Sequence, residues 1–381
     1  MMSIPLSDDN PFQSLIAEAN NDSATLQSRY ENHRVARNSQ QSAKILAESF
    51  PGWSLDEILK RLDGPGKEDG FVDPRNCLVI WARPSPQVRD LICFIQNELK
   101  SISPSLWLMP PENLHTTVLE AAHSLTEDQI EELVQTLLSC KDVTSADIAA
   151  YPRSRPTRLI KPMVSFDSAA LALSFVPAAG ECLEAESSGD TEPYTYHHLR
   201  RDVFDMVRQT KVPVASRYIV PSAHLTIARF ISQDGFLVKG SDGAETVDHS
   251  RVKLLIDKIE EINQKLENEY WPKEGAIREG GEWIVGQEGL VIRRGRLWYG
   301  GGERGLHDSG YTYILVLNQT FPSASRSNAC QVMDASNVTD GCSRIVVCFL
   351  KAITFQFQQI HASEPEALIT PDYAKSRDTA Y

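Results

Sequence analysis

The chain has 381 residues, of which 41% are hydrophobic and 23% charged, and this is enough apolar sequence for a sizeable core. Its formal net charge of −13 argues against a broad, sequence-indifferent nucleic-acid surface, because such binding needs many Lys and Arg contacts to phosphates. A small substrate, or an RNA end held by a local basic patch, is compatible with this charge.

The seven cysteines are scattered and none forms a C-x-x-C pair, so neither a disulfide scaffold nor a zinc site is predicted. The first residues are polar and acidic, without the basic start and apolar run of a signal peptide. The longest apolar stretch, 345–350, is too short to cross a bilayer. We therefore expect a cytoplasmic or nuclear protein, monomeric and without membrane contact.

The first 75 residues are predicted to form a helical extension. Apolar residues recur at helix spacing within 12–19 and again within 45–62. The polar, Asn/Gln/Ser/Arg-rich stretch between them has little to bury. Gly64-Pro65-Gly66 and Asp73-Pro74 punctuate the end of this extension.

From Cys77 the pattern changes to alternating strands and helices. A continuous apolar run at 77–84 predicts a strand, and Ser85 with Pro86 begins a helix. Residues 106–122 predict a strand, a Pro-Pro turn and a second strand, after which Thr126 caps another helix. The same order recurs in the second half, with strands at 163–167 and 170–177, a helix at 196–209 and a strand within 216–231. This recurrence indicates a degenerate internal repeat.

Two further elements follow the repeat. A long helix is predicted over 251–269, and the Gly-punctuated segment 282–302 is predicted to be a hairpin. The tail at 306–381 has Ser/Asn-rich patches and no clear helix, and its role is unknown.

Two of the nine histidines share one pattern: His, any residue, Ser or Thr, hydrophobic. His115-Thr116-Thr117-Val118 and His224-Leu225-Thr226-Ile227 each lie on the strand that closes one half of the repeat. A single match is expected by chance in many proteins, whereas two in equivalent places are much stronger evidence. Because side chains alternate along a strand, the His and the second Thr of the first motif share a face, as do His224 and Thr226.

Two imidazoles and two hydroxyls at one concave spot suit acid/base chemistry on a phosphate. With an ordinary pKa near 6.5, one imidazole can act as base and the other as acid near neutrality. The hydroxyls can donate to the non-bridging phosphate oxygens. No carboxylate cluster or Cys/His spacing suggests a metal, so we expect neither metal nor cofactor. The competing interpretation is that the histidines are core residues bonded to the backbone and that the threonines are ordinary strand formers.

The segments LWLMPPENLHTTVLE and AHLTIARF together resemble the two-histidine (2H) phosphoesterase superfamily, which includes bacterial 2′-5′ RNA ligase-like proteins and plant cyclic phosphodiesterases. The resemblance runs from about Cys77 to Phe230, and residues 282–302 are similar to the closing strands of the family. It implies a bilobal α+β fold with pseudo-two-fold symmetry, in which two antiparallel-sheet lobes flanked by helices surround a central cleft. It also implies that His115 and His224 are the catalytic acid/base pair, and that Thr117 and Thr226 bind the phosphate of the substrate.

The resemblance also divides the chain and suggests an activity. It implies an N-terminal extension at 1–75, a phosphoesterase domain at 76–305 and a tail at 306–381, with neither end supplying catalytic groups. The implied reaction is metal-independent hydrolysis of a 2′,3′-cyclic phosphate or a related phosphodiester of a small nucleotide or an RNA end. Two alternatives stay open: an RNA 3′-end trimming phosphodiesterase, and a catalytically idle nucleotide- or RNA-binding module.

Three weaker features could add to such a site. The basic segment 151–162 is either a phosphate-gripping loop or simply a solvated one. Arg229 has the opposite strand parity from His224, so a direct phosphate contact needs a bend or a bulge. Three aromatic residues could stack a nucleobase or belong to the core: Trp107, Tyr218 and Trp298.

Overall fold

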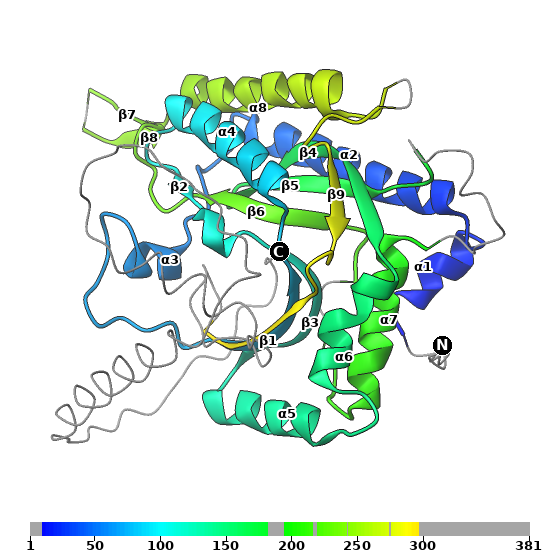
Figure 1. The fold of residues 1–381 in the computed structure, drawn as a ribbon. Coiled ribbons are helices and arrows are strands. Elements are labelled where there is room, and N and C mark those ends of the chain that lie inside the picture. The colour runs from blue at the N-terminus through cyan, green and yellow to red at the C-terminus, as the bar shows by residue number, and fades with distance from the viewer. Residues whose placement is uncertain (1–9, 182–193, 216–218, 242, 274–275, 297–381) are drawn as a thin grey trace, which may run out of the picture. The chain divides into compact units, whose positions relative to one another are not determined.

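One curled antiparallel sheet of eight strands organises the structure (Figure 1). The computed structural model describes residues 10–181, 194–215, 219–241, 243–273 and 276–296. The strand order is β10-β1-β3-β6-β5-β4-β9, and β2 pairs with β6 outside this path. The strands are β1 Asn76–Ala82, β2 Trp107–Leu108, β3 Thr116–Leu125, β4 Thr157–Phe166, β5 Ala170–Pro177, β6 Ala223–Arg229, β9 Glu282–Val285 and β10 Val291–Gly295. A separate two-stranded ribbon joins β7 (Leu237–Lys239) to β8 (Glu245–Val247).

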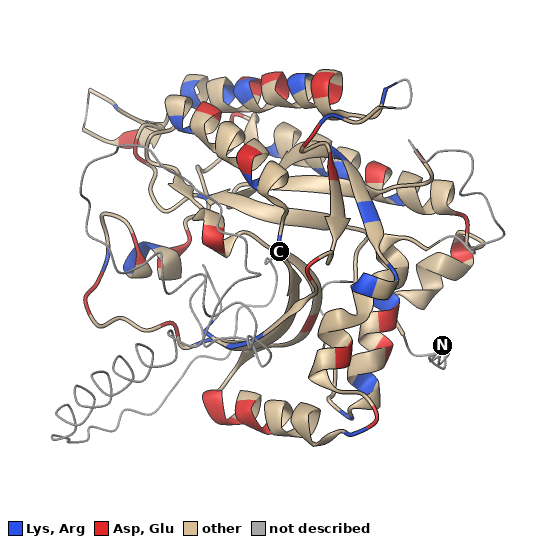
Figure 2. Ribbon diagram, in the orientation of Figure 1, with Lys and Arg blue, Asp and Glu red and all other residues tan. Residues whose placement is uncertain are grey.

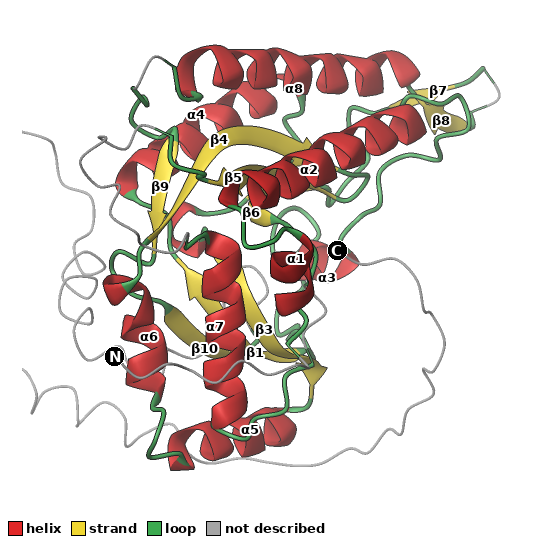
Figure 3. Ribbon diagram, turned by 90° about the vertical axis from the view of Figure 1, so that its right-hand side faces the viewer, coloured by secondary structure: helices red, strands yellow, loops and turns green. Residues whose placement is uncertain are grey.

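Eight α-helices flank the sheet within the described ranges, and with the antiparallel strands they confirm the α+β class. They are α1 Gln13–Glu18, α2 Ser23–Ile45, α3 Glu57–Leu62, α4 Pro86–Ile102, α5 Glu127–Ser139, α6 Ser145–Ser154, α7 Tyr196–Gln209 and α8 His249–Tyr270. Figure 3 shows α4 and α8 beside β4, β5 and β6, whereas α5, α6 and α7 lie with β1, β3 and β10. None of these helices is long and apolar enough to span a membrane.

The local signals in the sequence explain where several elements begin. Ser85 accepts a hydrogen bond from the amide of Val88 and caps α4, and Pro86 is its first residue, as predicted. Thr126 and Gln129 form a reciprocal capping box at the start of α5. Strand β1 is buried on both faces: Leu78 and Ile80 join the main core, whereas Trp81 belongs to a small separate cluster on the opposite face.

The two groups of strands form one continuous sheet, whereas the resemblance implied two antiparallel-sheet lobes around a central cleft. The groups meet where Thr116 of β3 pairs with Leu225 of β6. Helix α7 contacts the backbone beside this junction through Arg200. Arg200 donates to the carbonyls of Val118 and Val220 at 3.2 and 2.8 Å.

The prediction of a hairpin at 282–302 is wrong, because the two strands of this segment do not pair with each other. Strand β9 pairs with β4 and strand β10 pairs with β1, so these consecutive strands lie at opposite edges of the sheet. Adjacency in sequence favours pairing, but here both outer strands already offer an unpaired edge that must be covered. Residues 297–302 of the predicted segment lie outside the described residues, as does the tail at 306–381.

The polar stretch that was expected to bury little is the 23-residue helix α2. Its inward stripe is polar because it faces the backbone at an interruption of the β4–β5 ladder. There Pro162 has no N–H, and Lys161 adopts a φ of +56°. Arg34 donates to the carbonyls of Lys161 and Ser174 at 2.6 and 3.3 Å, and Asn38 donates to the carbonyl of Val164 at 3.0 Å.

Candidate functional site

The two His-containing motifs lie on neighbouring strands. Thr116 of β3 pairs with Leu225 of β6 in antiparallel register. The residues that flank this pair therefore lie opposite one another, and their side chains leave the same face of the sheet because side chains alternate along a strand. Thr116 and Leu225 are buried, whereas the flanking residues are half-buried. The side chains brought together in this way are His115 opposite Thr226 and Thr117 opposite His224.

The imidazole of His115 is held on two sides. Its ring stacks on Trp81, with ring centroids 3.8 Å apart and an interplanar angle of 19°. Its Nδ1 lies 2.6 Å from the carbonyl oxygen of Asn113, which can only accept, so Nδ1 carries the hydrogen and the lone pair of the neutral ring is on Nε2. The pKa of His115 is lowered to about 3, mainly by burial and also by the neighbouring charges of Arg83, His224 and Arg293, against a smaller opposing effect of the Asn113 carbonyl.

His224 has a similar electrostatic environment on the adjacent strand. Its Nδ1 lies 2.9 Å from the hydroxyl of Ser222, which can donate or accept. The pKa of His224 is lowered to about 4, mainly by burial and also by the positive charges of Arg200, Arg37 and Arg229, together with His33. Both imidazoles are therefore neutral at pH 7 in the unliganded protein, whereas the sequence suggested ordinary values near 6.5.

A β-bulge changes the position of Arg229. On β6, Thr226 pairs with Ala172 and Ala228 pairs with Leu171, so Ile227 is an extra residue and the strand parity shifts after it. Ile227 and Ala228 are both buried, and Arg229 returns to the half-buried face that carries His224 and Thr226. The bulge that the sequence analysis required for a phosphate contact is thus present.

The N-terminal helices approach this site, which the sequence analysis did not predict. Asp56, the N-cap of α3, forms an ion pair with Arg229 at 3.1 Å. Arg37 of α2 is held by Asp167 at 3.1 Å and is close enough to His224 to lower its pKa. No local signal could have found these residues, because each acts across more than 100 positions of sequence. These contacts place two side chains of the extension near the candidate site. That the extension supplies no catalytic group stays a prediction.

The basic segment 151–162 is not a loop. It forms the end of α6 and the first half of β4. Arg158 is paired with Glu282 of β9, Arg153 donates to the carbonyl of Glu288 at 3.0 Å, and Lys161 lies 3.8 Å from Glu181. These cations hold neighbouring elements together, and neither of the two loops that the sequence left open, phosphate-gripping or solvated, describes this segment.

Of the three candidate base-stacking residues, the structure describes only Trp107. Trp107 is 8% exposed, and its indole N–H donates to Asp63 at 2.9 Å, so it is a core residue with a satisfied polar group. Tyr218 and Trp298 lie outside the described residues.

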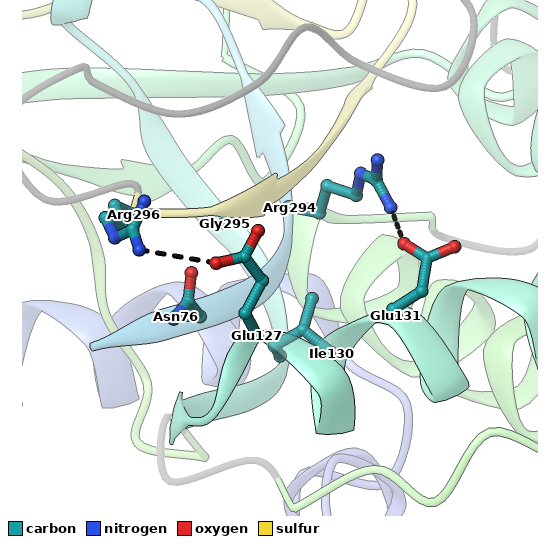
Figure 4. A pocket seen from close by; sticks show the side chains of 7 residues that line it. All are labelled: Asn76, Glu127, Ile130, Glu131, Arg294, Gly295 and Arg296. Carbon is teal, nitrogen blue, oxygen red and sulfur yellow. Dashed lines mark hydrogen bonds and ion pairs between the residues drawn. The ribbon is translucent and has the colours of Figure 1, made fainter. Parts of the chain in front are cut away.

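A hollow elsewhere on the molecule is lined mainly by charged residues. It lies between α5 and the far ends of β1 and β10 (Figure 4). Glu131 is paired with Arg294 there, and Glu127 lies 3.3 Å from Arg296. Figure 2 shows that acidic residues gather at the start of α5, while both signs alternate along α8. The charges that line this hollow compensate one another. The hollow also lies at the opposite end of β1 from Trp81, which stacks on His115, so we do not assign it to the candidate site.

Within the described ranges, no three His, Cys, Asp or Glu side chains gather as a protein-built metal site would need. No protein-family model matches the chain, and no curated protein matches it either. The similarity to two-histidine phosphoesterases therefore rests on the two motifs themselves.

Two other buried histidines predict a steep loss of stability in acid. His197 and His198 are 0% and 3% exposed and tie α7 to the N-terminal helices, through Tyr30 and Phe12 for the first and Asn21 for the second. Burial is the main cause that lowers their pKa values to about 3 and about 4. The unfolded chain takes up these protons first, so stability that is complete above pH 6.5 is lost as the pH falls toward those values.

We expect the free energy of unfolding to fall by on the order of 3 kcal/mol between pH 7 and pH 5 from this pair. Urea unfolding at the two pH values measures it. A double His197→Gln, His198→Gln variant should show a flatter dependence, and equal stability of the wild type at both pH values would contradict the prediction.

Proposed function

We propose that this protein is a two-histidine phosphoesterase that hydrolyses a 2′,3′-cyclic phosphate or a related phosphodiester of a nucleotide or RNA end. The observation that carries the proposal is the β3–β6 register, with each motif's His opposite the other motif's Thr on one half-buried face. Two imidazoles and two hydroxyls so arranged can surround one phosphorus atom.

In the proposed reaction a water attacks phosphorus and the bond from phosphorus to one ribose oxygen breaks, so that a phosphomonoester forms. One imidazole accepts the proton of the water, and the other donates a proton to the leaving oxygen. The hydroxyls of Thr117 and Thr226 donate to the non-bridging oxygens. The guanidinium of Arg229, returned to this face by the bulge, compensates the negative charge of the phosphate.

The lowered pKa values add one requirement to this scheme. With both imidazoles neutral at pH 7, the unliganded protein has a base but little of the acid form. A bound phosphodiester brings a negative charge beside both rings and favours their protonated forms, so its binding raises their pKa values. The same observation keeps the binding-module alternative open, because a protein that never gains this proton would bind without turnover.

This predicts a pH–rate profile displaced toward acid. We expect kcat/KM, which reports the free protein, to rise by up to about tenfold per unit as the pH falls from 7.5 toward 5. The profile of kcat, which reports the complex, should be bell-shaped with limbs at higher pH, and its two apparent pKa values belong to the coupled pair. Steady-state kinetics from pH 5 to 8 measure both, and a flat kcat/KM with chemistry rate-limiting would contradict the mechanism.

The proposal itself is tested with a panel of phosphodiesters followed by phosphorus NMR in the presence of EDTA. The panel contains nucleoside 2′,3′-cyclic phosphates, 3′,5′-cyclic phosphates and short RNAs with either a cyclic or a hydroxyl 3′ end. Hydrolysis of the 2′,3′-cyclic compounds supports the proposal, whereas nucleotide-by-nucleotide shortening of hydroxyl-ended RNA supports the trimming alternative. Binding without turnover of any compound would identify a binding module.

A further inference from the structure

The tryptophan beneath His115 has a place in the fold that suggests more than packing. Trp81 pairs with Thr117 in the β1–β3 register, so it leaves the sheet on the face of the candidate site. It is 3% exposed, and it belongs to the small cluster with Cys77 and Val79 rather than to the main core. Its buried indole ring therefore provides a surface on which the imidazole of His115 stacks.

Two other contacts make this arrangement specific. The Asn113 carbonyl fixes the hydrogen on Nδ1, so a proton that arrives at His115 binds Nε2. Arg83, which follows β1, donates to the carbonyl of Leu114 at 3.0 Å and so holds the backbone immediately before His115. The stack on Trp81 thus fixes the plane of the imidazole, the Asn113 carbonyl fixes its tautomer, and Arg83 fixes the backbone just before His115.

The charges around His115 show how the indole of Trp81 can affect the protonation of the imidazole. Arg83, Arg293 and His224 all disfavour a proton on this imidazole, and burial disfavours it most. The face of an indole carries the negative part of its quadrupole and attracts a stacked cation. The Asn113 carbonyl favours the protonated ring, and the face of Trp81 is placed to do the same.

We propose that Trp81 is a positioning residue for His115, fixing the plane of the imidazole and stabilising the form that carries a proton on Nε2. Its kinetic consequences rest on the proposed function, whereas its effect on the titration of His115 does not. A residue of this kind acts through the imidazole and does not touch the substrate.

The direct test is a histidine NMR titration of the full-length protein between pH 5 and 8, with inorganic phosphate as the bound anion. The resonance missing in His115→Asn identifies His115. Removing the aromatic face in Trp81→Leu should lower the apparent pKa of His115 by about half to one pH unit, and Trp81→Phe should restore most of it. Equal titration of His115 in wild type and Trp81→Leu, or a His115 that stays neutral throughout in the wild type, would overturn the proposal.

A second probe covers the case in which Trp81→Leu does not fold. Growth with 5-fluorotryptophan leaves the shape of the ring nearly unchanged and weakens its negative face, so the pKa of His115 should again fall. An unchanged titration in the fluorinated protein counts against the proposal as well.

The kinetic arm separates this inference from the function on which it rests. With a 2′,3′-cyclic nucleotide, Trp81→Leu should lower kcat on the order of tenfold with little change in KM, and Trp81→Phe should recover it. A change confined to KM would mean that the ring contacts the substrate, and would overturn the positioning role. If the wild type cleaves nothing, the proposed function fails while the titration still decides the inference. If the wild type cleaves the substrate but the pKa of His115 does not change when Trp81 is replaced, only the inference fails.

Discussion

Replacing either His115 or His224 with asparagine is expected to lower kcat by on the order of 10²–10⁴, the range for losing one general acid or base. The β3–β6 register places the two motifs side by side, and in the proposed reaction each ring transfers a different proton. Asparagine keeps much of the size and polarity of the imidazole, so the fold should survive. Turnover of a 2′,3′-cyclic nucleotide, measured at equal fractions of folded protein, gives the effect.

His249 offers a matched control, because it is exposed at the start of α8. His249→Asn should leave kcat within about twofold, since surface substitutions of this kind change little. The double variant His115→Asn, His224→Asn should be hardly slower than the worse single one, because the two imidazoles act as a unit. Near-wild-type turnover in either single variant would refute the paired mechanism.

Deleting residues 1–70 is expected to abolish cooperative folding of the rest. Among its described residues the deleted segment buries eight large hydrophobic side chains, and each contributes about 1.5–3 kcal/mol, so their sum of about 12–24 kcal/mol matches or exceeds the net stability of a typical domain. These side chains are Phe12, Ile16, Leu26, Tyr30, Ile45, Phe50, Trp53 and Leu59. Trp53 also stacks on Phe230 next to Arg229, with ring centroids 3.9 Å apart. Soluble expression and thermal melting of the 71–381 fragment measure the outcome.

A point substitution in α2 tests how much this helix contributes to stability. Arg34→Met removes the donors that α2 offers to the carbonyls of Lys161 and Ser174, and we expect a cost of about 2–5 kcal/mol in the free energy of unfolding. Arg29→Met on the exposed face of the same helix should cost less than about 0.5 kcal/mol. A soluble, cooperatively melting 71–381 fragment would contradict the deletion prediction. A cost at Arg34 no larger than that at Arg29 would contradict the role given to Arg34.

Hydrophobic periodicity predicted the elements whose partners are apolar. The helices α4, α5, α7 and α8 and the strands β1, β5 and β6 were expected from this signal and are present. It failed for α2, because Arg34 and Asn38 occupy the inward stripe where a periodicity argument needs apolar side chains. A polar stripe that satisfies backbone carbonyls looks, in sequence, like a solvated surface.

The candidate site was accessible to the sequence only where its residues are local. The pairing of His with Thr two positions later follows from strand alternation, and the register of β3 with β6 brings the two motifs together. The place of Arg229 depends on the bulge at Ile227, which no local signal marks. The roles of Trp81 and Arg37 depend on which distant elements become neighbours, and periodicity carries no information about that.

The strands β9 and β10 follow one another in the chain but pair with opposite edges of the sheet. Six residue steps separate Val285 from Val291, and a fully extended chain spans at most about 3.6 Å per residue, so these edges can stand no more than about 22 Å apart there. The connection is thus a tether of fixed maximum length across one end of the curl. If the two strand groups flex about the Thr116–Leu225 pair, the tether limits their separation at that end. A backbone nick within 286–290 would remove this limit without removing a single side chain.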